Sequence, residues 1–217
     1  MFNLFPRRIK ICGLTNLADA LVAVDCGVRT LGFVFHPPSP RAVTSQRAQE
    51  IIRYLPPDVV RVGVFVDQSP DRVQATVDAC GLTAVQWHGA EPDEWLAAVN
   101  VPAVKAFRIR TAADLAGLRV YPSATAVLVD AWSPVTVGGT GECWDWSLAA
   151  SLPPLDKPLI LAGGLTPDNV AAAIRQVRPA AVDVSGGVEA APGRKDHDRI
   201  RRFVAAALET FNELHRN

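Results

Sequence analysis

The sequence predicts an α/β protein of the (β/α)8 barrel (TIM barrel) class, built as a single domain. Short apolar runs alternate with helix-like segments eight times, and no linker or low-complexity stretch interrupts them. β-branched runs of this kind are typical of strands buried on both faces of a parallel sheet. The chain of 217 residues suits one barrel at 9–217, preceded by an N-terminal tail at 1–8. A flavodoxin-like sheet is the alternative, but it would leave three strands unplaced.

The first strand–helix unit carries the residue around which the other units are arranged. Ile9 and Ile11 alternate with Lys10, which predicts a short strand, and Cys12 stands at the carboxyl end of that strand. Gly13 permits a tight turn into a helix that ends near position 27. Ligands of parallel α/β folds bind at this end of the strands, so Cys12 is a candidate for chemistry. A buried structural thiol is the alternative.

The other units follow in order along the chain. Strands are expected at 30–35, 59–66, 84–87, 103–109, 126–130, 159–162 and 181–184. Helices are expected at 44–55, 69–81, from 92, at 111–118, at 144–152 and from 166. A last helix is expected from an apolar stripe of Ile200, Phe203, Val204 and Leu208. Long loops are expected at 36–41 and at 131–143.

Composition excludes several classes of function. Lys and Arg number 22, as do Asp and Glu, so neither a nucleic acid nor a membrane surface is an expected partner. No apolar stretch is long enough to span a bilayer, and the N-terminal tail is too short for a signal peptide. The four cysteines have no C-x-x-C spacing, which argues against a zinc site or a disulfide framework and favours a reducing cytoplasm. They are Cys12, Cys26, Cys80 and Cys143.

A carboxyl group is expected opposite the Cys12 thiol. Asp130 ends an apolar strand on the other side of the predicted barrel mouth. A carboxyl group in such a place can act as a general acid if burial raises its pKa, although a loop-capping aspartate is the alternative. A thiol and a carboxyl group facing each other suit proton removal and proton delivery on one small substrate.

Two glycine pairs predict a phosphate site. Gly163 and Gly164 follow the seventh strand, and Ser185, Gly186 and Gly187 follow the eighth. Paired glycines let backbone N–H groups approach an anion closely. Because these two loops form the usual phosphate cradle of a (β/α)8 barrel, the pairs indicate binding of a phosphorylated small molecule rather than simple turns.

Two further side chains are candidates for substrate binding. Arg41 lies just past the second strand and can hold a carboxylate through two parallel hydrogen bonds; a solvated loop arginine is the alternative. His88 ends the fourth strand, where it either orients substrate or is structural. The sequence suggests no second histidine to pair with it, so no metal site is expected.

An ordered set of motifs makes the chain resemble the phosphoribosylanthranilate isomerase family of tryptophan biosynthesis, from about 9 to 203. The motifs are Lys-Ile-Cys-Gly-Leu-Thr at 10–15, Gly-Phe-Val-Phe at 32–35, Arg-Val-Gly-Val-Phe-Val at 61–66, Val-Gln-Trp-His-Gly at 85–89, Leu-Val-Asp at 128–130, Gly-Gly-Thr-Gly at 138–141 and Ala-Gly-Gly-Leu at 162–165, with a last stretch from 183 to 197.

The resemblance implies an aldose–ketose isomerase that performs an Amadori rearrangement. By the same resemblance, Asp130 is the general acid, Cys12 the general base and Arg41 the ligand of the anthranilate carboxylate, while Gly164 and Gly187 lie in the phosphate loops. The implied chemistry needs no metal or redox cofactor. We expect a monomer or homodimer acting in the cytoplasm of the cell.

Two positions depart from the family pattern. Trp87 stands where leucine is usual, and Gly186 stands where serine is common, which puts one phosphate donor in doubt. The sister isomerase of histidine biosynthesis carries aspartates where this chain has Cys12 and Phe107-Arg108. A ribulose-phosphate epimerase would need metal-binding histidines that this chain lacks at the third strand. A non-catalytic barrel that binds a phosphorylated ligand is the remaining alternative.

Overall fold

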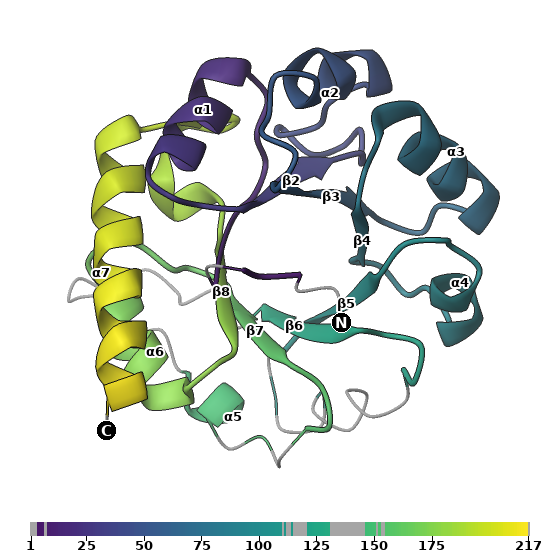
Figure 1. Cartoon of the computed structure of the whole chain (residues 1–217). Helices are drawn as coiled ribbons and strands as arrows, with labels where there is room; N and C mark the ends of the chain where they lie inside the picture. The colour runs from purple at the N-terminus through teal and green to yellow at the C-terminus, as the bar shows by residue number, and fades with distance from the viewer. Residues whose placement is uncertain are drawn as a thin grey trace.

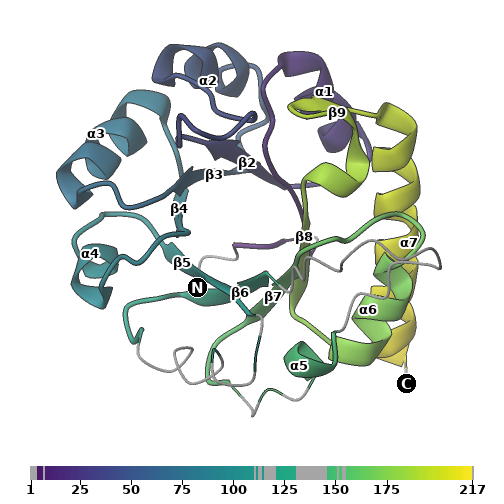
Figure 2. The same ribbon diagram turned by 180° about the vertical axis from the view of Figure 1, so that it is seen from behind.

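The computed structural model describes residues 4–6, 8–109, 111, 114, 121–130, 146–150, 152 and 155–216. Its central feature is a closed barrel of eight parallel strands in sequence order, with the helices around it (Figures 1 and 2). The strands are β1 Ile9–Ile11, β2 Thr30–Val34, β3 Val60–Phe65, β4 Ala84–Trp87, β5 Ala103–Arg108, β6 Ala126–Asp130, β7 Leu159–Ala162 and β8 Ala181–Val184. Parallel pairing of β1 with β8 closes the ring, with Ile9 opposite Val182. The predicted fold class is therefore confirmed.

Most helices are shorter than the sequence predicts. They are α1 Leu17–Asp25, α2 Ser45–Ile52, α3 Pro70–Cys80, α4 Asp93–Ala97, α5 Ser147–Ala150, α6 Val170–Val177 and α7 His197–Arg216. Capping explains the two ends that were foreseen best: Thr44 accepts from the Arg47 N–H at the start of α2, and Gly81 ends α3 in the left-handed conformation. The expected loop at 131–143 lies outside the described residues, as does most of the helix expected at 111–118.

The chain between β8 and α7 differs from the expectation. A short 3-10 helix, η2 Gly186–Val188, is followed by a small antiparallel hairpin of β9 Glu189–Ala191 and β10 Arg194–Lys195. The helix expected from 166 also begins later, because the Thr166 N–H bonds to the Asn169 side chain and 166–169 form a turn first. Among the described helices none is long and apolar enough to cross a membrane.

The inside of the barrel is filled by alternate residues of the strands, as the two-residue period of a strand requires. At the end opposite the strands' carboxyl termini, Leu4 and Phe5 of the N-terminal segment join this interior cluster and are almost fully buried. The Thr30 hydroxyl donates to the Leu4 carbonyl oxygen at 2.9 Å, which fixes the segment against β2. Figure 1 shows the N-terminal segment lying across the ring of strands.

Candidate active site

A cavity of about 580 Å³ opens at the carboxyl ends of the strands. It is lined by every residue that the sequence predicts for the site, namely Cys12, Arg41, His88, Asp130, Gly163, Gly164, Ser185, Gly186 and Gly187. His36 and Arg108, which also follow strand ends, line it too. Asp67 does not line the cavity and instead accepts a hydrogen bond from the Ala90 N–H. The (β/α)8 topology alone therefore brings together residues that are up to 175 positions apart.

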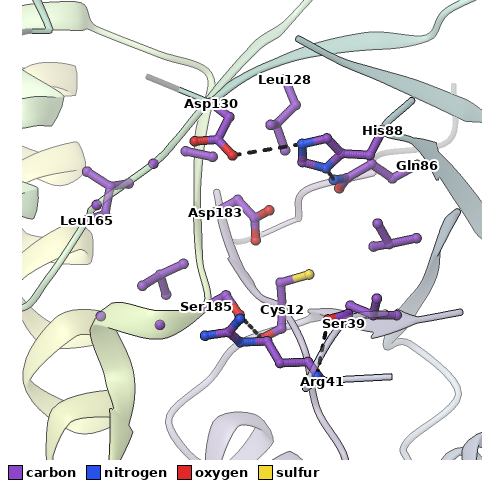
Figure 3. Close-up of a pocket in the computed structure, with 18 of the residues that line it drawn as sticks. Cys12, Ser39, Arg41, Gln86, His88, Leu128, Asp130, Leu165, Asp183 and Ser185 are labelled. Carbon is purple, nitrogen blue, oxygen red and sulfur yellow. Dashed lines mark hydrogen bonds and ion pairs between the residues drawn. The ribbon is translucent and has the colours of Figure 1, made fainter. Parts of the chain in front are cut away.

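Cys12 projects into the cavity from the end of β1 (Figure 3). Its backbone N–H continues the barrel ladder by donating to the Val184 carbonyl oxygen at 2.8 Å, and its carbonyl oxygen accepts from the Ser185 hydroxyl at 3.0 Å. Both bonds fix the backbone from which the thiol extends. The side chain is buried, and burial raises the pKa of the thiol although the Lys10 charge opposes that shift.

Asp130 enters the same cavity from β6, on the far side of Asp183 from Cys12 in Figure 3. The His88 Nε2 atom lies 3.8 Å from one Asp130 carboxylate oxygen, which is beyond a hydrogen bond. Burial, helped by the positive charges of Arg108, Lys10 and Lys105, lowers the pKa of His88 to about 4. At neutral pH the imidazole is therefore uncharged and forms no ion pair with Asp130.

A hydrogen-bond chain settles which ring nitrogen of His88 carries the proton. The Lys10 ammonium donates to Gln86 Oε1 at 3.0 Å, so the Gln86 amide nitrogen faces His88 Nδ1 at 3.2 Å. Nδ1 must then accept, and the proton of the neutral ring sits on Nε2. Among the described residues Nε2 has no hydrogen-bond partner, and the atom is buried beside the cavity.

Two glycine-rich loops form one wall of the cavity. Gly163 and Gly164 have φ values of 89° and 58°, in the left-handed region that favours glycine. At Gly187 a Cβ atom would lie 1.7 Å from the Leu165 carbonyl oxygen, so the loops after β7 and β8 touch through their backbones. This close approach of two backbones is what a phosphate cradle requires.

Arg41 lies beside the loop that follows β8 (Figure 3), where it is held by a carboxylate that the sequence analysis missed. Its Nε and Nη2 atoms donate to the two carboxylate oxygens of Glu189 at 2.8 and 2.6 Å. Glu189 also accepts from Lys195 at 2.9 Å, and although its burial raises the pKa, these two cations outweigh that effect and lower it. A guanidinium has five N–H donors, so the Nη1–Nη2 edge of Arg41 can still take a second carboxylate end-on.

Gly186, where serine is common in the family, is not held by its backbone conformation. Its φ lies outside the left-handed region, so the backbone itself accepts a side chain there. A Cβ atom would lie 3.3 Å from Arg41 Nη2, so the side chain would point toward Arg41. A serine hydroxyl at this position would therefore adjoin the guanidinium.

We expect Gly186→Ser to change KM while inhibition by inorganic phosphate stays within about threefold of wild type, which is about 0.7 kcal/mol, because the serine hydroxyl would adjoin Arg41. The melting temperature should not fall, because the backbone conformation tolerates a side chain. Inhibition constants for phosphate, measured beside KM, check this. A tenfold gain in phosphate affinity would instead place the side chain of residue 186 in the phosphate cradle.

Three polar residues in the barrel interior also escaped the sequence analysis: Lys10, Gln86 and Asp183. Lys10 and Asp183 are register partners on the neighbouring strands β1 and β8, and the Lys10 ammonium also reaches Gln86 on β4, so only the closed barrel shows the three to be one cluster. Within the described ranges no group of three or more histidine, cysteine or acidic side chains could hold a metal ion. Cys12, Cys26 and Cys80 are free thiols, whereas Cys143 lies outside those ranges.

Comparison with known proteins decides the family. The family model for N-(5'-phosphoribosyl)anthranilate isomerase matches residues 9–206, which is nearly the whole chain. The chain belongs to the N-(5'-phosphoribosyl)anthranilate isomerase family. The isomerase of Pelobacter propionicus is 50% identical over 206 residues, covering 95% of this chain and 98% of that protein. The isomerase of Geobacter sulfurreducens is 52% identical over 200 residues, covering 92% and 98%.

Solved structures of phosphoribosylanthranilate isomerases show the same barrel. The crystal structure from Thermotoga maritima has a TM-score of 0.86 and 43% identity, covering 92% of this chain and 98% of that one. An isomerase in complex with reduced 1-(o-carboxyphenylamino)-1-deoxyribulose 5-phosphate has a TM-score of 0.81 and 40% identity, covering 92% and 97%. A third structure describes monomers generated from the dimeric isomerase of T. maritima, so both states occur among the relatives.

Proposed function

We propose that this chain converts N-(5-phosphoribosyl)anthranilate into 1-(2-carboxyphenylamino)-1-deoxyribulose 5-phosphate, an Amadori rearrangement in tryptophan biosynthesis. The observation that carries the proposal is one cavity whose lining combines a thiol, a carboxyl group, a guanidinium and two glycine-rich loops. The substrate has a matching set of groups: a carboxylate for the guanidinium, a phosphate for the glycine-rich loops and the reacting carbons between them.

The chemistry divides between the carboxyl group and the thiol. Asp130, in its protonated form, gives its proton to the ribose ring oxygen; the bond from C1 to that oxygen breaks and the nitrogen lone pair forms a Schiff base. Cys12, as the thiolate, then removes the proton from C2, and the electron pair moves toward C1 and the nitrogen to give an enolamine. The enolamine tautomerises to the ketone. C1 is reduced as C2 is oxidised, so the reaction balances within the substrate and needs no redox cofactor.

Substrate binding is assigned to the remaining residues of the site. The free edge of Arg41 holds the anthranilate carboxylate. The phosphate lies against the loops that contain Gly163, Gly164, Ser185, Gly186 and Gly187, with backbone N–H groups as donors. His88 offers its Nε2–H, as a neutral donor, to the ribose portion. The protein works as a monomer or homodimer in the cytoplasm.

The proposal is tested with the purified protein and N-(5-phosphoribosyl)anthranilate. We expect the fluorescence of the substrate to fall at a rate proportional to the enzyme concentration. Mass and chromatography should identify the product as the carboxyphenylamino-deoxyribulose phosphate. The same protein should give no turnover with the aminoaldose of histidine biosynthesis, whose isomerase carries aspartate where Cys12 stands. If the protein binds the substrate but the fluorescence does not fall, the protein is a non-catalytic barrel that binds a phosphorylated ligand.

We expect Arg41→Ala to weaken substrate binding by roughly tenfold to a hundredfold, because a charge-assisted hydrogen bond is worth about 1.5–3 kcal/mol. The loss should appear in KM, and kcat should change less. Arg47→Ala is the matched control, since Arg47 is an exposed arginine of α2 that pairs with Glu50 outside the cavity. If KM and stability are both unchanged in Arg41→Ala, Arg41 does not bind the anthranilate carboxylate.

A further inference from the structure

The inference starts from a lysine in the barrel interior. Lys10 and Cys12 are two residues apart on one strand, so their side chains leave the same face of β1 and enter the barrel. Lys10 is fully buried. Gly32 on β2 makes room for both, because a Cβ atom there would lie 2.7 Å from Cys12 Sγ and 3.1 Å from Lys10 Cε. The thiol and the end of the lysine side chain therefore share one glycine-lined space.

The position of the ammonium group is fixed by two partners on other strands. Lys10 Nζ donates to Asp183 Oδ2 at 2.7 Å and to Gln86 Oε1 at 3.0 Å. An ammonium has three donors, so one N–H of Lys10 remains beside these two bonds. Residues of β4 and β8 thus hold a positive charge close to the thiol that follows β1.

Lys10 remains charged in this position, and its charge acts directly on the thiol. Burial lowers the pKa of Lys10, but Asp183 and Cys12 outweigh that effect and raise it. For Cys12, burial raises the pKa, Lys10 opposes the shift most strongly, Asp183 adds to it and Lys195 opposes it weakly. Among the described residues, the charged or titratable groups that line the cavity with Cys12 or act on its thiol are Lys10 on β1, His36 and Arg41 after β2, His88 after β4, Arg108 on β5, Asp130 on β6, Asp183 on β8 and Lys195 on β10.

We propose that Lys10 is the positioning residue that makes Cys12 able to act as a base, by stabilising the thiolate from a site held by Asp183 and Gln86. The inference rests on the proposed role of Cys12 in proton removal. It also accounts for the buried ion pair between Lys10 and Asp183. Replacing such a pair by apolar residues costs a fold little stability, so stability alone does not explain its presence. Its role is to keep the base charged in a space that otherwise favours the neutral thiol.

Two variants test the proposal with opposite signs. Lys10→Met removes the positive charge at similar length, so the thiol pKa should rise by at least about one unit, since an opposite charge within ~4–6 Å shifts a pKa by about 1–3 units. Asp183→Asn removes the negative charge and keeps an oxygen for Lys10, so the thiol pKa should fall. The ultraviolet absorbance of the thiolate is followed against pH, and each curve is corrected with the matching Cys12→Ser protein.

Lys105→Met is the matched control. Lys105 is also buried in a barrel strand and pairs with a carboxylate, Glu91, at 2.6 Å, but it does not line the cavity. The thiol titration should be unchanged in this variant. In Lys10→Met, kcat at neutral pH should fall at least about tenfold and recover as the pH rises, because each unit of pKa reduces the thiolate fraction tenfold.

An unmoved thiol pKa in Lys10→Met, or an equal rise in Lys105→Met, would overturn the inference. If Lys10→Met does not fold, Asp183→Asn decides, and a thiol pKa that does not fall there overturns it. The proposed function is tested separately: turnover in Cys12→Ser would remove the base assignment even if the thiol titration follows Lys10. If the thiol pKa is unchanged in Lys10→Met while Cys12→Ser loses activity, the inference about Lys10 is wrong and the proposed function stands.

Discussion

Cys12→Ser should lower kcat at least about a hundredfold with little change in KM. A positioned general base contributes about 10²–10⁴-fold, and a hydroxyl group, unlike a thiol, is not ionised in the accessible pH range. Serine is nearly the same size and keeps the backbone bonds to Val184 and Ser185, so the loss is chemical rather than structural. Steady-state kinetics with N-(5-phosphoribosyl)anthranilate measure both constants.

Cys26→Ser is the control for Cys12→Ser. Cys26 is the C-cap residue of α1, partly exposed and outside the cavity, so its replacement should leave kcat and KM unchanged. If Cys12→Ser turns over nearly as fast as wild type, the Cys12 thiol is not the general base. A parallel rise of KM would instead show that the thiol contributes to binding.

Asp130→Asn should also lower kcat at least about a hundredfold, because the amide keeps the shape of the side chain but has no proton to transfer to the ring oxygen. KM should change little. Steady-state kinetics and a pH profile of kcat check this result.

Asp67→Asn is the control for Asp130→Asn. Asp67 also follows a barrel strand, but it caps the loop at Ala90 and does not line the cavity. Asparagine can keep that hydrogen bond and tolerates the positive φ of 51° at this position. A small loss in Asp130→Asn would mean that the sugar ring opens without help, at a rate fast enough for turnover.

The barrel strands were predictable where the sequence has an apolar run with clear ends. β4, β6, β7 and β8 begin and end at the predicted residues, because each is a β-branched or aromatic run between polar or turn residues. Helix ends were less predictable, since a side-chain cap or a turn can replace the first helical turn, as at 166–169. The hairpin after β8 has no periodicity in its two-residue strand, and only Pro192-Gly193 marks its turn.

The candidate site was predictable to the extent that strand ends specify it. Cys12, Asp130 and the glycine pairs each follow a strand, so the topology alone places them in one cavity. The residues that hold them were not predictable. Lys10 alternates with apolar neighbours and suggests a solvent-facing position, yet its partner Asp183 is 173 residues away in the chain. No local pattern encodes a pairing between the first and the last strand of a barrel.

The packing of Leu4 and Phe5 fills the barrel interior at the amino ends of the strands, away from the cavity. In the described part of the chain the cavity opens at the carboxyl ends of the strands, so substrate and product share one opening. The product must depart before the next substrate arrives. A reduced analogue of the product should therefore compete with the substrate, and raising the substrate concentration should abolish its inhibition completely.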